Sequence, residues 1–243
     1  VGADVFAAPH DKLGEMIVGG LILENTHADQ LKDTFVQASL DATSYGGKLY
    51  GYPTAIETYA LFYNKALLSD PPDTWKDVEE FAKTFNKPQE GKYAIAWDVG
   101  NAYYSYIFLS AFGADLFGPG GTDKDKHMVN SPEAVKGLSY FQNFRKQYLD
   151  VAQADLAGDF MNAGFQNGTI AMVITGPWSI QGYRDAGVNF GVAPLPKFEG
   201  MSEPPASFSG IRAMYVSSFT KYPEEAHKFA IYLTSKEALL KRY

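Results

Sequence analysis

Two carboxylates, Asp11 and Glu57, are the residues of this sequence best suited to chemistry on a polar ligand. Asp11 is followed by Lys12, so a hydrogen-bond acceptor and a donor stand side by side. Two carboxyl groups at a fixed separation also carry out glycoside hydrolysis in many enzymes. Sequence spacing alone does not exclude such a catalytic pair here. The structural alternative is that Asp11 caps a helix and that Glu57 lies at the end of a strand.

The sequence lacks the residue patterns of thiol, metal, nucleotide and serine-hydrolase chemistry. The chain contains no cysteine, which excludes thiolate nucleophiles, disulfides and zinc–thiolate sites. Its four histidines have no close-spaced partner of the metal-ligand type, and the common nucleotide-binding, metalloprotease and serine-hydrolase motifs are missing. We therefore predict that the protein holds no metal and no cofactor.

Composition narrows the class further. The 243 residues carry a net charge of -7 with no run of lysine or arginine, which argues against nucleic acid as a partner. A hydrophobic fraction of 46% favours a folded chain with a sizeable core, and no apolar run approaches the ~20 residues of a membrane span. The aromatic fraction of 15% includes 16 tyrosines, whose flat faces and polar tips suit a hydrated binding surface.

Short apolar runs alternate with amphipathic segments, a pattern typical of α/β proteins. Thr74 with Asp77, and Ser131 before Pro132, predict two helix N-termini. Strands are predicted at residues 4–8, 49–53, 57–64, 92–97, 169–174, 190–193 and 212–217, with the second and third forming a pair. Helices are predicted at 11–19, 28–40, 75–85, 103–112, 132–148, 159–167, 177–186 and 223–233.

Two of these helices have apolar stripes that we expect to face a core: Trp75, Val78, Phe81 and Phe85 in one, and Val135, Leu138, Phe141, Phe144 and Tyr148 in the other. The uncharged segment 103–112 is expected to be a buried helix. The chain starts at Val1 without a signal segment and stops inside a helical pattern, so we expect it to be a piece of a longer protein.

Several motifs occur in a fixed order along the chain. They are PHDKLG at 9–14, YGGKLYGYP at 45–53, Glu57 before YNKALL at 63–68, PDTW at 72–75, FQNG at 165–168 before Ala171 and Met172, GPW at 176–178, and the segment 191–196. In this order and spacing they resemble the extracellular solute-binding proteins of carbohydrate importers, most closely the maltose/maltodextrin-binding proteins.

The resemblance implies an α/β fold of the periplasmic-binding-protein type (type II), with two lobes that close around a ligand in the cleft between them. It implies that the fold is incomplete in this chain. Residues 1–56 would be part of the first lobe, 57–208 most of the second, and 209–243 a return to the first. The hinge would run near 55–58 and 208–213.

The resemblance also assigns candidate ligand-binding residues. Asp11 and Lys12 match a hydroxyl-binding pair of the family, and Glu57 matches a carboxylate of the cleft. Three aromatic residues match aromatic positions of the site: Tyr103, Tyr104 and Trp178. Each of the three can instead be a core residue, and Lys12 can be a solvated helix residue.

These residue types suit a sugar, because a pyranose ring has an apolar face and a rim of hydroxyl groups. The resemblance implies a non-enzymatic binding protein that delivers maltose or maltodextrin to the membrane permease of an ABC importer. Such a protein would be extracellular, either as a lipid-anchored lipoprotein at the cell surface or in a periplasm. Ala8 stands where one family member has tryptophan, so another oligosaccharide or a cyclodextrin remains an alternative ligand. A glycoside hydrolase that uses Asp11 and Glu57 remains the alternative from another class.

Overall fold

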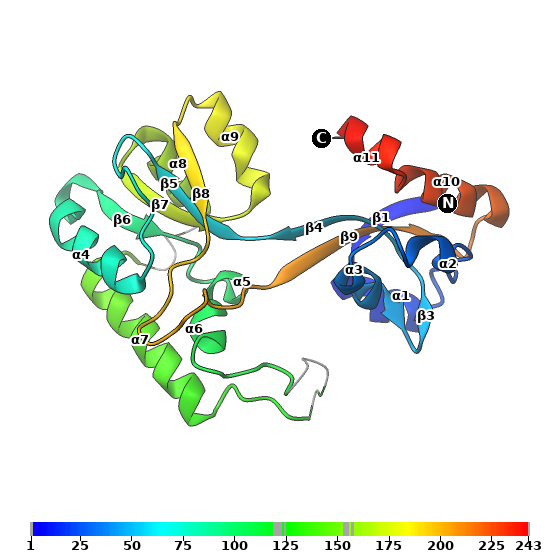
Figure 1. Cartoon of the computed structure of the whole chain (residues 1–243), viewed down its shortest axis with the longest axis horizontal. Coiled ribbons are helices and arrows are strands. Elements are labelled where there is room, and N and C mark those ends of the chain that lie inside the picture. Colours follow the sequence, from blue (N-terminus) through cyan, green and yellow to red (C-terminus); the bar gives the residue numbers. More distant parts are fainter. Residues whose placement is uncertain (1, 119–122, 124, 153–155, 157, 243) are drawn as a thin grey trace. The chain divides into compact units, whose positions relative to one another are not determined.

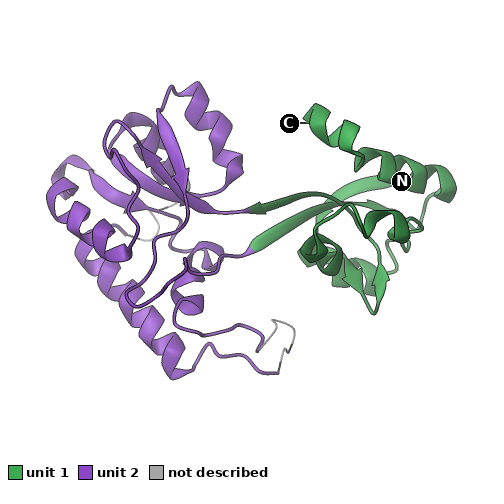
Figure 2. Ribbon diagram, in the orientation of Figure 1, with its two compact units in different colours: residues 1–57, 209–243 green, residues 58–208 purple. Residues whose placement is uncertain are grey.

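The computed structural model describes residues 2–118, 123, 125–152, 156 and 158–242. The chain folds into two compact units (Figure 2). Unit 1 consists of Val1–Glu57 and Ser209–Tyr243, and unit 2 of Thr58–Phe208. The chain therefore passes between the units twice, after Glu57 and after Phe208. Helices and strands alternate in both units (Figure 1), which confirms the predicted α/β class.

Unit 1 is built on a three-stranded sheet in the order β1 (Val5–Pro9), β9 (Ser209–Val216) and β4 (Tyr52–Thr58). Strands β1 and β9 are antiparallel. Alternate residues of β9 point to opposite faces, and its last four residues place apolar side chains on both faces. Ala213 and Tyr215 pack with residues of α1 (Leu13–Val18), and Val216 packs with residues of α10 (Pro223–Leu233).

Shorter elements complete unit 1, and one of them corrects a prediction. The predicted helix 28–40 is wrong, because α2 (Ala28–Leu31) and α3 (Gln37–Ala42) are separate. Between them the Thr34 hydroxyl donates to main-chain carbonyls of the preceding turn, and Phe35 packs against the core of the unit. The remaining elements are η1 (His10–Lys12), β2 (Ser44–Tyr45), β3 (Lys48–Leu49) and α11 (Lys236–Arg242).

The side chain of Tyr52 links β4 to His27, which precedes α2, and to His227 of α10. This side chain is fully buried, and its hydroxyl lies 2.7 Å from Nδ1 of His227 and 3.2 Å from Nδ1 of His27. Burial raises the pKa of Tyr52 to about 12. Burial lowers the pKa of His227, and the nearby His27 lowers it further. The fold of unit 1 therefore favours the neutral form of His227.

Unit 2 contains a four-stranded sheet in the order β6 (Tyr93–Ala96), β7 (Ile170–Thr175), β5 (Ala60–Asn64) and β8 (Phe190–Ala193). Strands β6 and β7 are parallel, whereas β5 is antiparallel to β7 and to β8. All six residues of β7 are buried, as expected for a continuous apolar run in a central strand. The predicted pairing of 49–53 with 57–64 is wrong, because β4 and β5 belong to different sheets.

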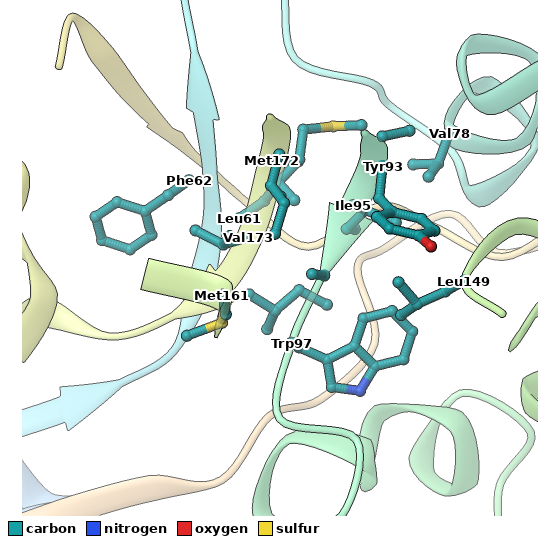
Figure 3. Packing of buried hydrophobic residues seen from close by; sticks show 14 of the residues in the cluster. Leu61, Phe62, Val78, Tyr93, Ile95, Trp97, Leu149, Met161, Met172 and Val173 are labelled. Atoms are coloured by element: carbon teal, nitrogen blue, oxygen red, sulfur yellow. The ribbon is translucent and has the colours of Figure 1, made fainter. Parts of the chain in front are cut away.

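The core of unit 2 lies between this sheet and its helices. Figure 3 shows part of this core, with Leu61, Met172 and Ile95 from three strands of the sheet and Trp97 among its buried side chains. Trp75, the first residue of α4 (Trp75–Phe85), packs against Trp97 with ring centroids 5.9 Å apart. The predicted capping box before this helix is present: Thr74 and Asp77 bond each other's backbone N–H groups.

The longest helix, α7 (Pro132–Tyr148), begins at the predicted cap, and three of the five predicted core residues, Phe141, Phe144 and Tyr148, pack against the core. Val135 and Leu138 are exposed. Gly137 faces the core instead, and a Cβ atom at this position would lie only 1.9 Å from the carbonyl oxygen of Phe108. The close approach of two backbones, which only glycine allows, decides the rotation of the helix.

The predicted buried helix 103–112 is also wrong in part. Two short helices, α5 (Ala102–Ser105) and α6 (Ile107–Ser110), replace it, and Tyr103 and Tyr104 are partly exposed. The side chain of Asn101 accepts a hydrogen bond from the backbone N–H of Tyr103 and so fixes the start of α5. The other elements of unit 2 are η2 (Pro88–Glu90), α8 (Gly158–Asn167), η4 (Pro177–Ser179) and α9 (Ile180–Asp185).

Candidate functional site

The predicted pair in unit 1, Asp11 and Lys12, lies in the short helix η1 directly after β1. The turn is held against β9, because His10 Nδ1 accepts a hydrogen bond of 3.1 Å from the backbone N–H of Ile211. Pro9 occupies the N-cap position and no side chain caps this helix, so Asp11 does not act as a cap. Both side chains are exposed, and Lys12 has only a long 3.4 Å contact to Glu15. Ion pairs of this kind are weak, so the pair is available to a ligand.

Glu57 lies near the end of β4 in the same unit, as the sequence predicted. Its carboxylate accepts a hydrogen bond of 3.2 Å from Nε of Arg212 on β9. Sequence reasoning missed Arg212. The available signal was its charge inside the otherwise uncharged strand sequence of residues 211–216.

Unit 2 contributes an aromatic cluster, which we define by six residues: Tyr59, Tyr103, Tyr104, Tyr106, Trp178 and Phe208. Its rings contact one another in edge-to-face, stacked and tilted arrangements. The ring of Tyr103 is the centre of the cluster, with its centroid 4.9 Å from that of Tyr59, 5.2 Å from that of Tyr104 and 5.9 Å from that of Phe208. Tyr106, Tyr59 and Phe208 were not predicted, although Tyr106 follows Tyr103 by one helical turn.

Trp178 is the most exposed member of this cluster. It follows the Pro177 that opens η4, and 48% of its surface is accessible. The indole lies against the α-carbon of Gly176: a Cβ atom there would be 2.2 Å from the ring. The ring centroids of Trp178 and Tyr103 are 6.4 Å apart. Trp178 is therefore not a core residue, and it presents a flat apolar surface beside Tyr103.

The tyrosine hydroxyls of the cluster are suited to hydrogen bonding and not to proton abstraction. Burial raises the pKa of Tyr104, and the carboxylate of Asp98 adds to the shift. Burial likewise raises the pKa of Tyr59. Both phenols stay protonated at neutral pH, and that of the partly exposed Tyr104 can donate to a ligand oxygen, whereas the hydroxyl of Tyr59 is buried.

The two sets thus differ in chemistry: unit 1 offers ionised groups, and unit 2 offers rings. In the described part of the chain, no group of three or more histidine or acidic side chains is arranged to hold a metal ion. Among the same residues, no helix combines the length and the apolar character needed to cross a membrane. The six candidate residues remain a prediction as ligand contacts.

Comparison with known proteins identifies the family. The model of a family described as bacterial extracellular solute-binding protein matches residues 1–243. A solved structure of a cyclo/maltodextrin-binding protein complexed with maltotetraose is 42% identical, with a TM-score of 0.88, over 99% of this chain and 62% of that chain. This match confirms a periplasmic-binding-protein fold and shows that the chain corresponds to only part of it.

Two curated relatives differ in their ligands. A maltooligosaccharide ABC transporter solute-binding lipoprotein of Streptococcus pneumoniae is 34% identical over 96% of this chain and 56% of its own length. A galactooligosaccharide-binding protein of Bacillus subtilis is 31% identical over 100% of this chain and 58% of its own length. The chain thus spans little more than half the length of these relatives.

The family consists of binding proteins found outside the cell, at least one of which is a lipoprotein. This confirms the non-enzymatic prediction at the level of the family and removes the support for a glycoside hydrolase. The order of the motifs, the α/β units and the match along the full chain agree. The chain belongs to the family of bacterial extracellular solute-binding proteins.

Proposed function

We propose that this chain binds maltodextrin-type oligosaccharides through the two sets of residues described above. Asp11, Lys12 and Glu57 would exchange hydrogen bonds with sugar hydroxyls, and Tyr103, Tyr104 and Trp178 would contact the apolar faces of the rings. The observation that carries the proposal is the half-exposed Trp178, held beside Tyr103 with one face available. The maltotetraose complex of the 42% identical protein supports the choice of sugar.

Binding in such a site uses two kinds of contact. Charge-assisted hydrogen bonds contribute roughly 1.5–3 kcal/mol each, and aromatic contacts add about 1 kcal/mol per ring beyond the burial of apolar area. A few of each reach the roughly 8 kcal/mol of a micromolar complex.

We further propose that the full protein delivers its sugar to the membrane permease of an ABC importer. The name of the Streptococcus pneumoniae relative supports both this role and a lipid-anchored location at the cell surface. A free periplasmic form would serve the same role. The assignment of units 1 and 2 to the two lobes of the longer protein is part of this proposal.

A second ligand class is favoured by one comparison. The galactooligosaccharide-binding protein of Bacillus subtilis is nearly as similar as the maltooligosaccharide relative. Galacto- and glucooligosaccharides differ in the orientation of single hydroxyls, and the polar residues of unit 1 are those that would distinguish them.

The test is calorimetric titration of the chain with maltotriose, maltotetraose, a cyclodextrin and a galactooligosaccharide, with a melting-temperature measurement for each. We expect saturable heat with the maltooligosaccharides and a raised melting temperature, because a ligand that binds only the native state stabilises it. We expect no new reducing ends after incubation. Tightest binding of the galactooligosaccharide would change the ligand class, and the absence of binding to every sugar would refute the proposal.

A further inference from the structure

We infer that Arg212 is a further sugar-binding residue and that it acts together with Glu57. The inference rests on the proposed function and extends it by a residue that no motif of the sequence singled out. It starts from the hydrogen bond of 3.2 Å between Arg212 Nε and Glu57 Oε1. Glu57 is mostly buried, with 26% of its side chain exposed, whereas 57% of the Arg212 side chain is exposed.

The Arg212 guanidinium has donors left over. An arginine side chain carries five N–H bonds, and the recorded bond to Glu57 uses the one on Nε. Within the described residues, Glu57 is the only recorded acceptor for this side chain. The exposed end of the guanidinium therefore offers its Nη hydrogens to a ligand beside a carboxylate that can accept.

This combination matches the chemistry of neighbouring hydroxyls on a sugar ring. One hydroxyl oxygen can accept from Arg212 while the next hydroxyl donates to Glu57. Asp11 and Lys12 in this unit likewise place a carboxylate and a cation next to each other in the sequence. Unit 1 would thus hold two such pairs, one on η1 and one between β4 and β9.

The backbone holds the Arg212–Glu57 pair in place. The carbonyl of Arg212 accepts a hydrogen bond of 3.0 Å from the Thr54 hydroxyl on β4, and Pro9 lies opposite Arg212 on β1. Gly210 leaves room for Glu57, because a Cβ atom there would lie 3.3 Å from Glu57 Cγ. Both side chains stand on paired strands, so the pair is positioned before a ligand arrives.

A purely structural role explains the pair less well. Ion pairs with a partner as exposed as Arg212 contribute little to stability. Arg212 is the one charged residue of β9 (Ser209–Val216), and its side chain is exposed. Recognition of a polar ligand would explain the charge of Arg212.

The test is calorimetric titration of maltotriose into the wild-type chain and into Arg212→Ala and Arg212→Lys. We expect Arg212→Ala to bind about 10- to 100-fold more weakly, the effect of losing a charged hydrogen bond. Arg212→Lys should recover part of this loss, because an ammonium group donates but lacks the fork of the guanidinium. Lys32→Ala is the matched control, because Lys32 is an exposed cation of the same unit that forms an ion pair with Asp29; we expect wild-type affinity.

Analogues of maltotriose that each lack one hydroxyl separate direct contact from structural support. In the wild-type chain, one analogue should bind about 10-fold more weakly than maltotriose, and in Arg212→Ala that difference should disappear. An unchanged affinity of Arg212→Ala, or an equal loss for every analogue, would overturn the inference. If the wild-type chain binds maltotriose and Trp178→Ala weakens it while Arg212→Ala does not, only this inference fails. If the wild-type chain binds no sugar, the proposed function fails as well.

Discussion

The two units present opposite kinds of candidate residues. In unit 1 the candidates are ionised side chains at the ends of strands, and their polar atoms are accessible. In unit 2 they are rings that support one another, from the buried Tyr59 to the half-exposed Trp178. Under the proposed function this difference would be a division of work, in which unit 1 distinguishes hydroxyl patterns and unit 2 supplies contact area that tolerates many sugars.

The largest effect on binding is expected from Trp178→Ala, which removes the most exposed ring of the aromatic cluster. We expect sugar binding to weaken by roughly 1–3 kcal/mol, the range for truncating a central aromatic contact. The melting temperature without sugar should change little, because the ring is half exposed. Calorimetric titration measures the loss.

Phe117→Ala is a matched control for this variant, because Phe117 also lies in unit 2 and is 48% exposed. It should bind sugar as the wild type does. Wild-type affinity in a folded Trp178→Ala protein would break the comparison, because the ring would then be structural.

A smaller loss is expected from Gly176→Ala. The new methyl group would occupy the space of the Trp178 indole, since its Cβ would lie 2.2 Å from the ring, and the ring must move. Binding should weaken, but by no more than in Trp178→Ala, and the double variant should match Trp178→Ala alone. Near-ultraviolet circular dichroism reports the movement of the indole, and calorimetric titration reports the loss of affinity.

Gly182→Ala serves as the control, because a Cβ atom there meets only an ordinary 3.6 Å contact with Gln166. If Gly176→Ala kept both the tryptophan spectrum and the affinity of the wild type, the support of Trp178 by Gly176 would be refuted.

Asp11→Asn tests the ionised side of the comparison. The amide keeps one acceptor oxygen but loses the charge, so the expected loss is about 1 kcal/mol, the difference between charged and neutral hydrogen bonds. Asp41 is an exposed residue of α3, and the Asp41→Asn protein should bind sugar as the wild type does.

Titrations at low and high salt sharpen the contrast between the two units. The contribution of Asp11 to the binding free energy should shrink with salt, whereas that of Trp178 should not. Equal salt sensitivity of the two variants would contradict the division of work.

The smallest effect concerns the stability of unit 1 and its pH dependence. Because burial lowers the pKa of His227, the unfolded chain binds more protons than the folded chain just below pH 6.5. Stability should therefore fall as the pH drops through 6.5 towards the lowered pKa. The groups around His227 are His27, Tyr52, Glu224 and Lys228.

Melting temperatures at pH 7.5 and 5.5 check this prediction. His227→Gln should lose less stability between the two pH values than the wild type, and His127→Gln, a change of an exposed histidine in unit 2, should behave as the wild type. A wild-type slope in His227→Gln would assign the acid sensitivity to other groups.

Local signals predicted much of the fold. Thr74 with Asp77, and Ser131 with Pro132, marked two helix starts because capping depends on neighbouring residues alone. The buried strand β7 was visible as an apolar run. The exposure of Val135 and Leu138 on α7 was not predictable, because it goes with the close contact of Gly137 with Phe108, which lie 29 positions apart in the chain.

The candidate site was predicted only where a motif carried it. Asp11, Lys12, Glu57, Tyr103, Tyr104 and Trp178 came from resemblance to the family. Arg212 is not part of any motif, and its hydrogen bond to Glu57 spans 155 positions of sequence. Phe208 likewise joins Tyr103 and Tyr106 only through the fold. Pairing across strands brings such residues together, and a single sequence does not display that pairing.

The contacts of Tyr52 have a further consequence for the two histidines of unit 1. A phenol has one hydrogen, so it can donate to the Nδ1 atom of one neutral imidazole only and must accept from the other. When both rings are neutral, His27 and His227 hold opposite tautomers, one protonated on Nδ1 and the other on Nε2. Nitrogen-15 spectra of the imidazole rings would reveal this asymmetry, and an exchange of the two tautomers would require the phenol to reverse the direction of its hydrogen bonds.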